Sequence, residues 1–239
     1  ISIGDIEIEE KIQNFTLSGD ANISLGEFSG NGTIKLDASN MTKNGLNLDF
    51  TELKGNVDLL TTSQDDTILL GDNAGKVLSG AGNDIVTLPT NVTGSADIRS
   101  GDGVDIITLA TNNFIDIINT GGTNISSIDK SAQTHSEIIA DKIINFDPDS
   151  DKIGIGSITA TSNNFLAETG ATNFGDALSK SDIAMTSGNQ YYFSYNVASA
   201  TEGFSLLFYD NDNNGSSDIV LTLTGITTNV ISHDHLIIV

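Results

Sequence analysis

The residues of this sequence whose type and spacing could do chemistry are aspartates that recur beside glycines. Residues 79–86 and 100–107 both fit the nonapeptide pattern G-G-x-G-x-D-x-U-x, where U is apolar, with serine in place of the first glycine. Carboxylates gathered in glycine-rich turns offer oxygen ligands that suit Ca²⁺, and glycine lets backbone carbonyls approach closely. The glycines and aspartates of the two segments are Gly80, Gly82, Asp84, Gly101, Asp102, Gly103 and Asp105, and turns of this composition could hold calcium.

The alternative for Asp84 and Asp105 is an Asx-turn, in which the carboxylate bonds to the backbone of its own turn. The glycine spacing favours calcium over that alternative. Asp66 lies 18 residues before Asp84 and shares its register. For Asp66 calcium and the turn are evenly balanced, because Thr62 and Gln64 replace both glycines.

The elements that must position these residues are short strands. Apolar segments rich in Ile, Val and Leu recur about 9 to 12 residues apart, and Gly, Asn, Asp and Ser lie between them. Most are too short for the strands of β-hairpins, which favours a solenoid with one strand per half-turn. Residues 1–60 keep this rhythm without the aspartate pattern. We expect further β-helix turns there, and more protein before Ile1 to cover the first turn.

The nonapeptide segment resembles the RTX repeats of bacterial proteins exported by type I secretion, which form a parallel β-roll. The resemblance implies that each nonapeptide is a half-turn and that calcium lies between stacked loops. Its ligands would be the repeat aspartates and the loop positions at Gly80, Gly82 and residues 101–103, where glycine lets backbone carbonyls approach closely. It places Asp66, Asp84 and Asp105 on one edge of the roll. The other edge carries Gly75 and Ala96, so we expect calcium mainly on one edge. Three additional residues, around position 89, predict a register slip or bulge there.

Residues 140–153 resemble the segment that follows the RTX roll in the C-terminal domain of serralysin-type proteins, which reads approximately A-D-x-I-x-D-F-x-x-x-x-D-x-I. The resemblance implies a strand, an acidic turn and a second strand. It gives Asp141 the position that closes the last calcium site of the roll. We interpret Asp147, Asp149 and Asp151 as turn residues rather than ligands.

A second acidic motif, at residues 210–218, reads D-N-D-N-N-G-S-S-D and matches the first nine positions of an EF-hand loop. Side chains at alternate positions of such a loop converge on one ion. Leu221 replaces the bidentate glutamate and the flanks are predicted strands, so the motif is not an EF-hand. A calcium-bearing hairpin loop and a solvated acidic hairpin are equally consistent with it. The ligands of the first would be Asp210, Asp212, Asn214 and Asp218.

The chain ends in an apolar run, residues 236–239, after an acidic stretch. This tail resembles the uncleaved C-terminal signal that RTX proteins present to their type I exporter. A closing edge strand is the alternative, and both can hold. His233 and His235 would share one face of an extended strand, although an H-x-H pair without a third ligand is more often surface than a metal site.

Composition excludes several classes of protein. The 239-residue chain has a formal net charge of −22, which opposes binding to nucleic acid. It has no Cys, and therefore no disulfide and no thiolate zinc site. No apolar run is long enough to span a membrane. No H-E-x-x-H, G-x-S-x-G or phosphate-binding loop occurs, so we expect no enzyme, although a glycosidase is not excluded by motif.

These observations predict an all-β protein, a right-handed parallel β-helix or RTX-like β-roll followed by a β-rich C-terminal cap. The expected domains are β-helix turns without a calcium signature over residues 1–60 and an RTX-like β-roll over residues 61–125. A β-rich cap with a type I secretion signal is expected over residues 126–239.

The resemblance and the composition favour a structural protein. We expect the C-terminal part of a calcium-binding, secreted bacterial surface-layer (S-layer) protein, located outside the cell on the bacterial surface. Its partners would be further copies in a surface lattice, the type I exporter and a cell-surface glycan, and Ca²⁺ would drive its folding after export. The alternative is the calcium-binding and secretion module of an extracellular RTX enzyme, a protease or lipase, or an adhesin.

Overall fold

The computed structural model describes residues 1–9, 11–129, 138–197 and 203–238. They form two compact units, Ile1–Thr120 with Asp149–Asp151, and Gly121–Pro148 with Lys152–Val239. Strands dominate both units and about 8% of the chain is helical, which confirms the predicted all-β fold. Among the described residues, no helix is long and apolar enough to cross a membrane.

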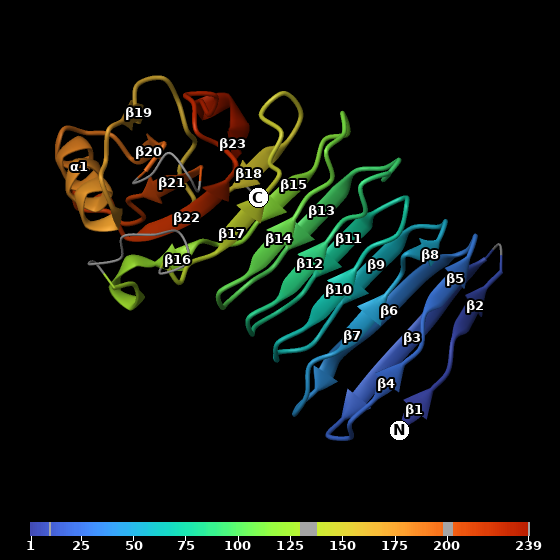
Figure 1. Ribbon diagram of the computed structural model, residues 1–239. Coiled ribbons are helices and arrows are strands. Elements are labelled where there is room, and N and C mark those ends of the chain that lie inside the picture. Colours follow the sequence, from blue (N-terminus) through green and yellow to red (C-terminus); the bar gives the residue numbers. More distant parts are fainter. Residues whose placement is uncertain (10, 130–137, 198–202, 239) are drawn as a thin grey trace. The chain divides into compact units, whose positions relative to one another are not determined.

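Parallel strands stack into a β-solenoid of about 8 turns in the described chain (Figure 1). In the first unit, one sheet contains, in spatial order, β14 (Ile106–Thr108), β12 (Ile85–Thr87), β10 (Thr67–Leu69) and β7 (Asn47–Asp49). A second contains β15 (Ile117–Asn119), β13 (Ala96–Arg99), β11 (Gly75–Leu78), β9 (Val57–Leu60), β6 (Thr33–Met41) and β3 (Ile12–Gly19). Shorter pairings join β2 (Ile6–Ile8), β5 (Phe28–Gly30) and β8 (Glu52–Leu53), and β1 (Ser2–Ile3) with β4 (Ser24–Leu25).

Each short strand turns its central apolar residue into the solenoid. Ile68, Val86 and Ile107 are register partners on one sheet, and all three are fully buried. Val77 and Ile98 are paired in the same way on the second sheet and are also fully buried. A strand of three or four residues suffices because the stacked neighbours supply both its hydrogen bonds and its apolar cover.

The three additional residues between Asp84 and Asp105 do not interrupt the stacking. Strands β12 and β14 pair without a shift from Ile85 to Thr87, and β11 and β13 pair without a shift from Gly75 to Leu78. The connection between β12 and β13, residues 88–95, contains the additional residues. The predicted slip is therefore confined to a loop.

The second unit is a mixed β-structure with one α-helix. Its main sheet has the order β19 (Phe165–Thr169), β20 (Tyr191–Tyr195), β21 (Phe204–Tyr209), β22 (Ile219–Thr224) and β17 (Lys142–Ile144), and β16 (Thr123–Asn124) also pairs with β22. Strand β18 (Lys152–Gly154) pairs in parallel with β23 (Leu236–Ile237). Short 3₁₀ helices are η1 (Ile125–Ser127) and η3 (His233–His235).

Helix α1 (Phe174–Thr186), which the sequence analysis did not predict, packs on β20 and β21. Phe174 lies 6.0 Å from Phe208 between ring centroids, and both residues belong to the buried core of this unit. Asn173 caps the helix by accepting the backbone N–H of Asp176 at 2.9 Å. The helix is thereby fixed beside the hairpin that carries the second acidic motif.

Candidate calcium-binding site

The three repeat aspartates lie one above another at the start of neighbouring strands. Asp66, Asp84 and Asp105 directly precede β10, β12 and β14, whose first residues are register partners. The Oδ1 atom of Asp84 accepts the backbone N–H of Asp66 at 2.7 Å, and the Oδ1 atom of Asp105 accepts that of Asp84 at 2.9 Å. We call this stack the aspartate ladder. All three side chains are at most 1% exposed.

Both carboxylate oxygens of Asp66 accept hydrogen bonds from the protein backbone. Its Oδ1 atom accepts the N–H of Leu46 at 2.6 Å, and its Oδ2 atom accepts the N–H of Thr62 at 2.9 Å. The hydroxyl of Thr62 lies within 3.2 Å of both oxygens. These contacts give Asp66 a structural role that needs no metal ion.

Asp84 differs from Asp66 in the hydrogen bonding of its Oδ2 atom. Its Oδ2 atom is buried and has no hydrogen-bond partner among the described residues. Burial raises the pKa of Asp84 to about 7, and the neighbouring carboxylates of Asp66 and Asp105 raise it further against the opposing effect of hydrogen bonds. Burial likewise raises the pKa of Asp105. A buried carboxylate oxygen without a donor is costly to ionise, and a cation or a proton would relieve that cost.

The glycines of the two repeats are required by the stacking of the loops. Gly80 and Gly101 have φ values of +104° and +89°, which disfavour other residues. A Cβ atom on Gly101 would collide with the carbonyl oxygen of Gly80, and one on Gly103 with that of Gly82. The glycines therefore bring successive loops into backbone contact.

Asp102 contributes through its backbone rather than its side chain. Its N–H donates to the carbonyl of Gly80 at 3.1 Å, and its carbonyl accepts the N–H of Gly82 at 2.9 Å. The Asp102 side chain is exposed. A second row of side chains, which the sequence analysis missed, runs beside the aspartate ladder: the N–H of Asn83 donates to Asp65 Oδ1 at 2.7 Å, and that of Val104 to Asn83 Oδ1 at 2.9 Å.

Buried aspartates also occur on the other edge of the solenoid, where the sequence analysis expected only Gly75 and Ala96. The Oδ1 atom of Asp116 accepts the N–H of Ala96 at 2.7 Å, and the N–H of Asp116 donates to Asp151 Oδ1 at 3.1 Å. Asp116 Oδ2 is buried and has no hydrogen-bond partner among the described residues. Burial raises the pKa of Asp116 to about 6, with a smaller contribution from Asp151. Asp151 is thus more than a turn residue.

Asp141 belongs to the second unit. Its backbone N–H donates to the hydroxyl of Thr123 at 2.8 Å, and that hydroxyl lies 3.1 Å from Asp141 Oδ1. The side chain is fully buried immediately before β17. It therefore occupies the same position before a strand as the repeat aspartates, and its role in closing a calcium site stays a prediction.

The second acidic motif forms the loop of the antiparallel hairpin β21–β22, as predicted. Carboxylate oxygens of Asp210, Asp212 and Asp218 lie within 4.8 Å of one another, a group that could hold a metal ion. The side-chain oxygen of Asn214, the fourth predicted ligand, accepts the N–H of Ser216 at 2.9 Å, and its role as a ligand stays a prediction. Gly215, at a φ of +84°, supplies the turn.

Backbone donors and helix α1 hold this loop in place. Asp210 is 1% exposed and accepts the N–H groups of Asn214 and Gly215 at 3.2 and 2.9 Å. The N–H of Ser217 donates to Asp182 on α1 at 2.8 Å. Carboxylate oxygens that are gathered before an ion arrives lower the entropy lost on binding.

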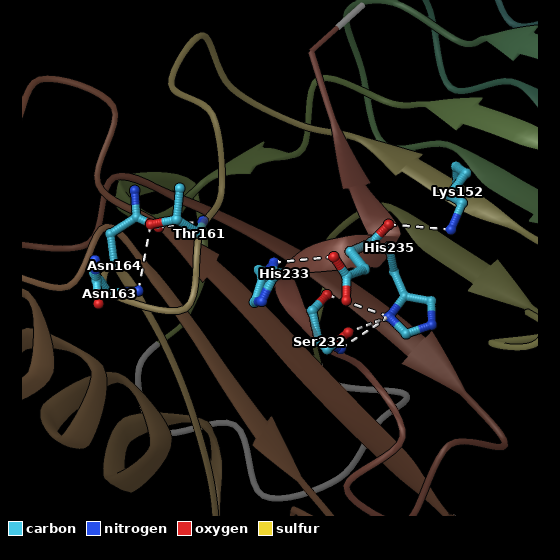
Figure 2. Close-up of polar contacts among 8 residues, drawn as sticks. Lys152, Thr161, Asn163, Asn164, Ser232, His233 and His235 are labelled. Carbon is cyan, nitrogen blue, oxygen red and sulfur yellow. Dashed lines mark hydrogen bonds and ion pairs between the residues drawn. The ribbon is translucent and has the colours of Figure 1, made fainter.

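The two tail histidines do not form a joint site. The tail is a 3₁₀ helix at this point, not an extended strand, so the expected shared face is absent here. Figure 2 shows the rings of His233 and His235 lying apart. His235 Nδ1 accepts the N–H of Ser232 at 2.9 Å, and its Nε2 lies 2.7 Å from the carbonyl oxygen of Pro148. The third histidine, His135, lies outside the described residues.

Within the apolar tail, Leu236 and Ile237 form strand β23. Leu236 of β23 pairs with Ile153 of β18. Lys152 Nζ donates to the carbonyl oxygen of Asp234 at 3.1 Å (Figure 2). The predicted closing strand is therefore present, and the predicted export signal stays a prediction.

The fold and these contacts define a class, a parallel β-solenoid whose strands start from buried aspartates. A scan against protein-family models found no match, and neither did a search of curated proteins. The RTX and serralysin resemblances therefore depend on the residues quoted for them.

Proposed function

We propose that the chain is a calcium-binding structural region of a secreted bacterial surface-layer protein. The observation that carries the calcium part is the buried Oδ2 atom of Asp84, which has no hydrogen-bond partner among the described residues. A divalent cation satisfies such an atom and offsets the neighbouring carboxylates of the aspartate ladder. Asp116 Oδ2 offers the same environment on the other edge.

The residues that would hold calcium come from both units. In the solenoid they are Asp84, Asp105 and backbone carbonyls of the glycine loops. In the second unit they are Asp210, Asp212 and Asp218. The bound ion would supply positive charge that no described lysine or arginine supplies to Asp84, and its binding energy would add to the free energy of unfolding.

The net charge of −22 supports a chain whose folded state is less stable before export than after it. In a medium poor in calcium, the stacked carboxylates repel one another and burial opposes their ionisation, so the folded state is disfavoured at neutral pH. In an extracellular medium rich in calcium, the ion removes both costs. This links folding to location without any enzymatic step.

Circular dichroism and thermal melting with CaCl₂ or EGTA at pH 7.5 test the calcium proposal. We expect calcium to raise the melting temperature by several degrees and increase β-structure. Equal melting curves in both media would refute calcium binding. Assembly into two-dimensional arrays on addition of calcium, seen by electron microscopy, tests the surface-layer part. A protein that binds calcium yet remains monomeric would instead support the module of an extracellular enzyme or adhesin.

A further inference from the structure

The outer face of one large sheet of the solenoid carries charges in a regular order. On β6, β9, β11 and β13, outward positions alternate with the fully buried Ile34, Leu59, Val77 and Ile98. Neighbouring strands pair without a shift over these positions, and they lie side by side in Figure 1. Each of the four strands presents two outward residues, so the face consists of two rows that run across the strands.

The first row is fully charged and alternates in sign. From β6 to β13 it contains the register partners Lys35, Asp58, Lys76 and Asp97. Read in the opposite direction, from β13 to β6, the row has the opposite charge at every position. Two copies of this row that meet in opposite directions therefore place a lysine against an aspartate at all four positions.

The second row has the same property. From β6 to β13 it contains the register partners Asp37, Leu60, Leu78 and Arg99. Reversal of this row exchanges the aspartate with the arginine and one leucine with the other. We call the two rows together the two-row face. Its three basic and three acidic side chains balance, although the whole chain has a net charge of −22.

We propose that the two-row face is a contact surface between two copies of this chain, an inference that rests on the proposed surface-layer function. The copies are related by a two-fold axis that runs parallel to the strands, between β9 and β11. Such an axis brings the same surface of both copies together and reverses each row. Asp37 then meets the partner's Arg99, and Leu60 meets the partner's Leu78.

The order of the charges selects this arrangement over its alternatives. All six charged side chains of the face meet an opposite charge, which favours the approach of two acidic molecules in this orientation alone. A two-fold axis across the strands would instead place Asp58 and Lys76 against leucines. Contact with other, acidic parts of the surface would bring like charges together.

The side chains of the face are free to make this contact. Two ion pairs form within the chain, one between β6 and β9 at 3.4 Å and one within β13 at 3.5 Å, and their side chains are 36–50% exposed. Exposed pairs of this kind are weak. Among the described residues, Lys76 and Asp37 form no ion pair. A hollow of about 210 Å³ lies beside Asp37 and Leu60, where it would receive the partner's Arg99.

The size of the face predicts a weak contact. The four strands span about 14 Å between Cα atoms, and the flanking β3 and β15 extend this to about 24 Å at the usual strand spacing. The face is therefore smaller than the roughly 800 Å² that each partner buries in a standard interface. The charge order decides which surfaces meet, and repeated contacts in a lattice hold the copies together.

A charge exchange between Asp37 and Arg99 tests the proposal. The two residues lie three strands apart, about 14 Å, so any coupling between them acts across the contact. Asp37→Arg and Arg99→Asp each bring like charges together twice in the dimer. Each should weaken association in CaCl₂ about tenfold in sedimentation velocity. The double variant should restore association, and so should an equimolar mixture of the two single variants.

Asp234→Arg is the matched control, because it changes the net charge as Asp37→Arg does but lies on the tail. It should not weaken association. Melting curves in CaCl₂ verify that every variant folds. If Asp37→Arg associates as the control does, or if the double variant stays as weak as the single ones, the proposed contact is wrong.

These outcomes separate the contact from the proposed function. A wild type that associates in calcium while the charge exchange has no effect leaves the surface-layer function standing and overturns the contact. A wild type that stays monomeric in CaCl₂ at high concentration overturns both. Equal melting curves in CaCl₂ and EGTA, with the charge exchange behaving as expected, would refute calcium binding and support the contact, since the two-row face contains no proposed calcium ligand.

Discussion

The carboxylate of Asp84 accepts the backbone N–H of Asp66, 18 residues earlier, at 2.7 Å. One oxygen of a buried side chain thus ties a turn to the turn before it, and the other oxygen has no hydrogen-bond partner among the described residues. The Oδ1 atom of Asp84 therefore has a structural role, whereas its Oδ2 atom can bind a proton or a cation. This division makes the effect of pH, of calcium and of mutation predictable in sign.

The first prediction concerns pH in the absence of calcium. Burial raises the pKa of Asp84 to about 7 and that of Asp116 to about 6 in the folded protein, above the ordinary value of 3.8. The folded state then binds more protons than the unfolded state between about pH 4 and pH 7, so stability falls as pH rises through this range. In EGTA the melting temperature should be higher at pH 5 than at pH 8.

Calcium should reverse that dependence, because the ion competes with protons for the same oxygens. In CaCl₂ the melting temperature at pH 8 should equal or exceed that at pH 5. A melting temperature that increases from pH 5 to pH 8 in EGTA would contradict the burial of ionisable aspartates. If the melting temperature falls by a similar amount from pH 5 to pH 8 in CaCl₂ and in EGTA, this would contradict calcium binding at these positions.

The second prediction compares two aspartates of one ladder. Asp84→Asn keeps an oxygen for the N–H of Asp66 and removes the buried charge, so in EGTA at pH 8 it should be at least as stable as the wild type. Calcium should stabilise this variant less than the wild type, because the site at the aspartate ladder is lost while Asp116 and the hairpin loop are unchanged. Asp66→Asn removes one of two oxygens that both accept backbone N–H groups, and should cost about 1–3 kcal/mol in either medium.

Urea denaturation of both variants in CaCl₂ and EGTA measures these changes. Asp97→Asn, on the outer face of β13, is the matched control and should behave like the wild type. A calcium response of Asp84→Asn as large as that of the wild type would mean that this carboxylate holds no ion.

Sequence reasoning located Asp66, Asp84 and Asp105 because an aspartate two residues before an inward apolar residue is a local pattern. Asp116 has the same spacing to Ile118, but its loop contains no glycine and, unlike Asp66, it does not lie 18 residues from another repeat aspartate, so the pattern was not recognised. Its contact with Asp151 spans 35 residues, which no local pattern reports.

Helix α1 escaped prediction for a different reason. Its buried positions include Ala177, Ser181 and Ala184, whose small side chains give a weak apolar period. The burial that stabilises the helix comes from the sheet beneath it, which includes Phe208 in ring contact with Phe174. The expectation of an extended strand was also wrong at His233 and His235. These residues form a 3₁₀ helix, and the side chain of His235 accepts the N–H of Ser232.

The third prediction separates the two costs of replacing a loop glycine. Gly101 and Gly19 have similar φ values of +89° and +100°, but a Cβ atom at Gly19 has nothing within 4 Å among the described residues. Gly19→Ala should therefore cost only about 1 kcal/mol for the backbone conformation. Gly101→Ala adds a collision with the Gly80 carbonyl and should cost clearly more.

Thermal or urea denaturation in CaCl₂ gives both values, and the difference between them measures the close stacking of the loops. Similar losses for the two variants would show that the loops can separate to admit a methyl group. In that case the glycines would be explained by their φ values and not by the approach of one loop to the next.

The last prediction concerns the hairpin loop of the second unit. Asp212 is exposed, and its contribution to the structure is one hydrogen bond from Asn214 at 3.1 Å, whereas Asp210 is buried and accepts two N–H groups. Asp212→Asn should therefore leave the melting temperature in EGTA almost unchanged and weaken calcium binding by about tenfold or more, since it removes one of three carboxylates. Isothermal titration with CaCl₂ measures the change, and Asp234→Asn, an exposed aspartate on the tail, is the control.

Asp210→Asn should lower the melting temperature in EGTA as well, because Asn has one oxygen for two donors. If Asp212→Asn binds calcium as the wild type does, the loop is a solvated hairpin and calcium binding belongs to the solenoid.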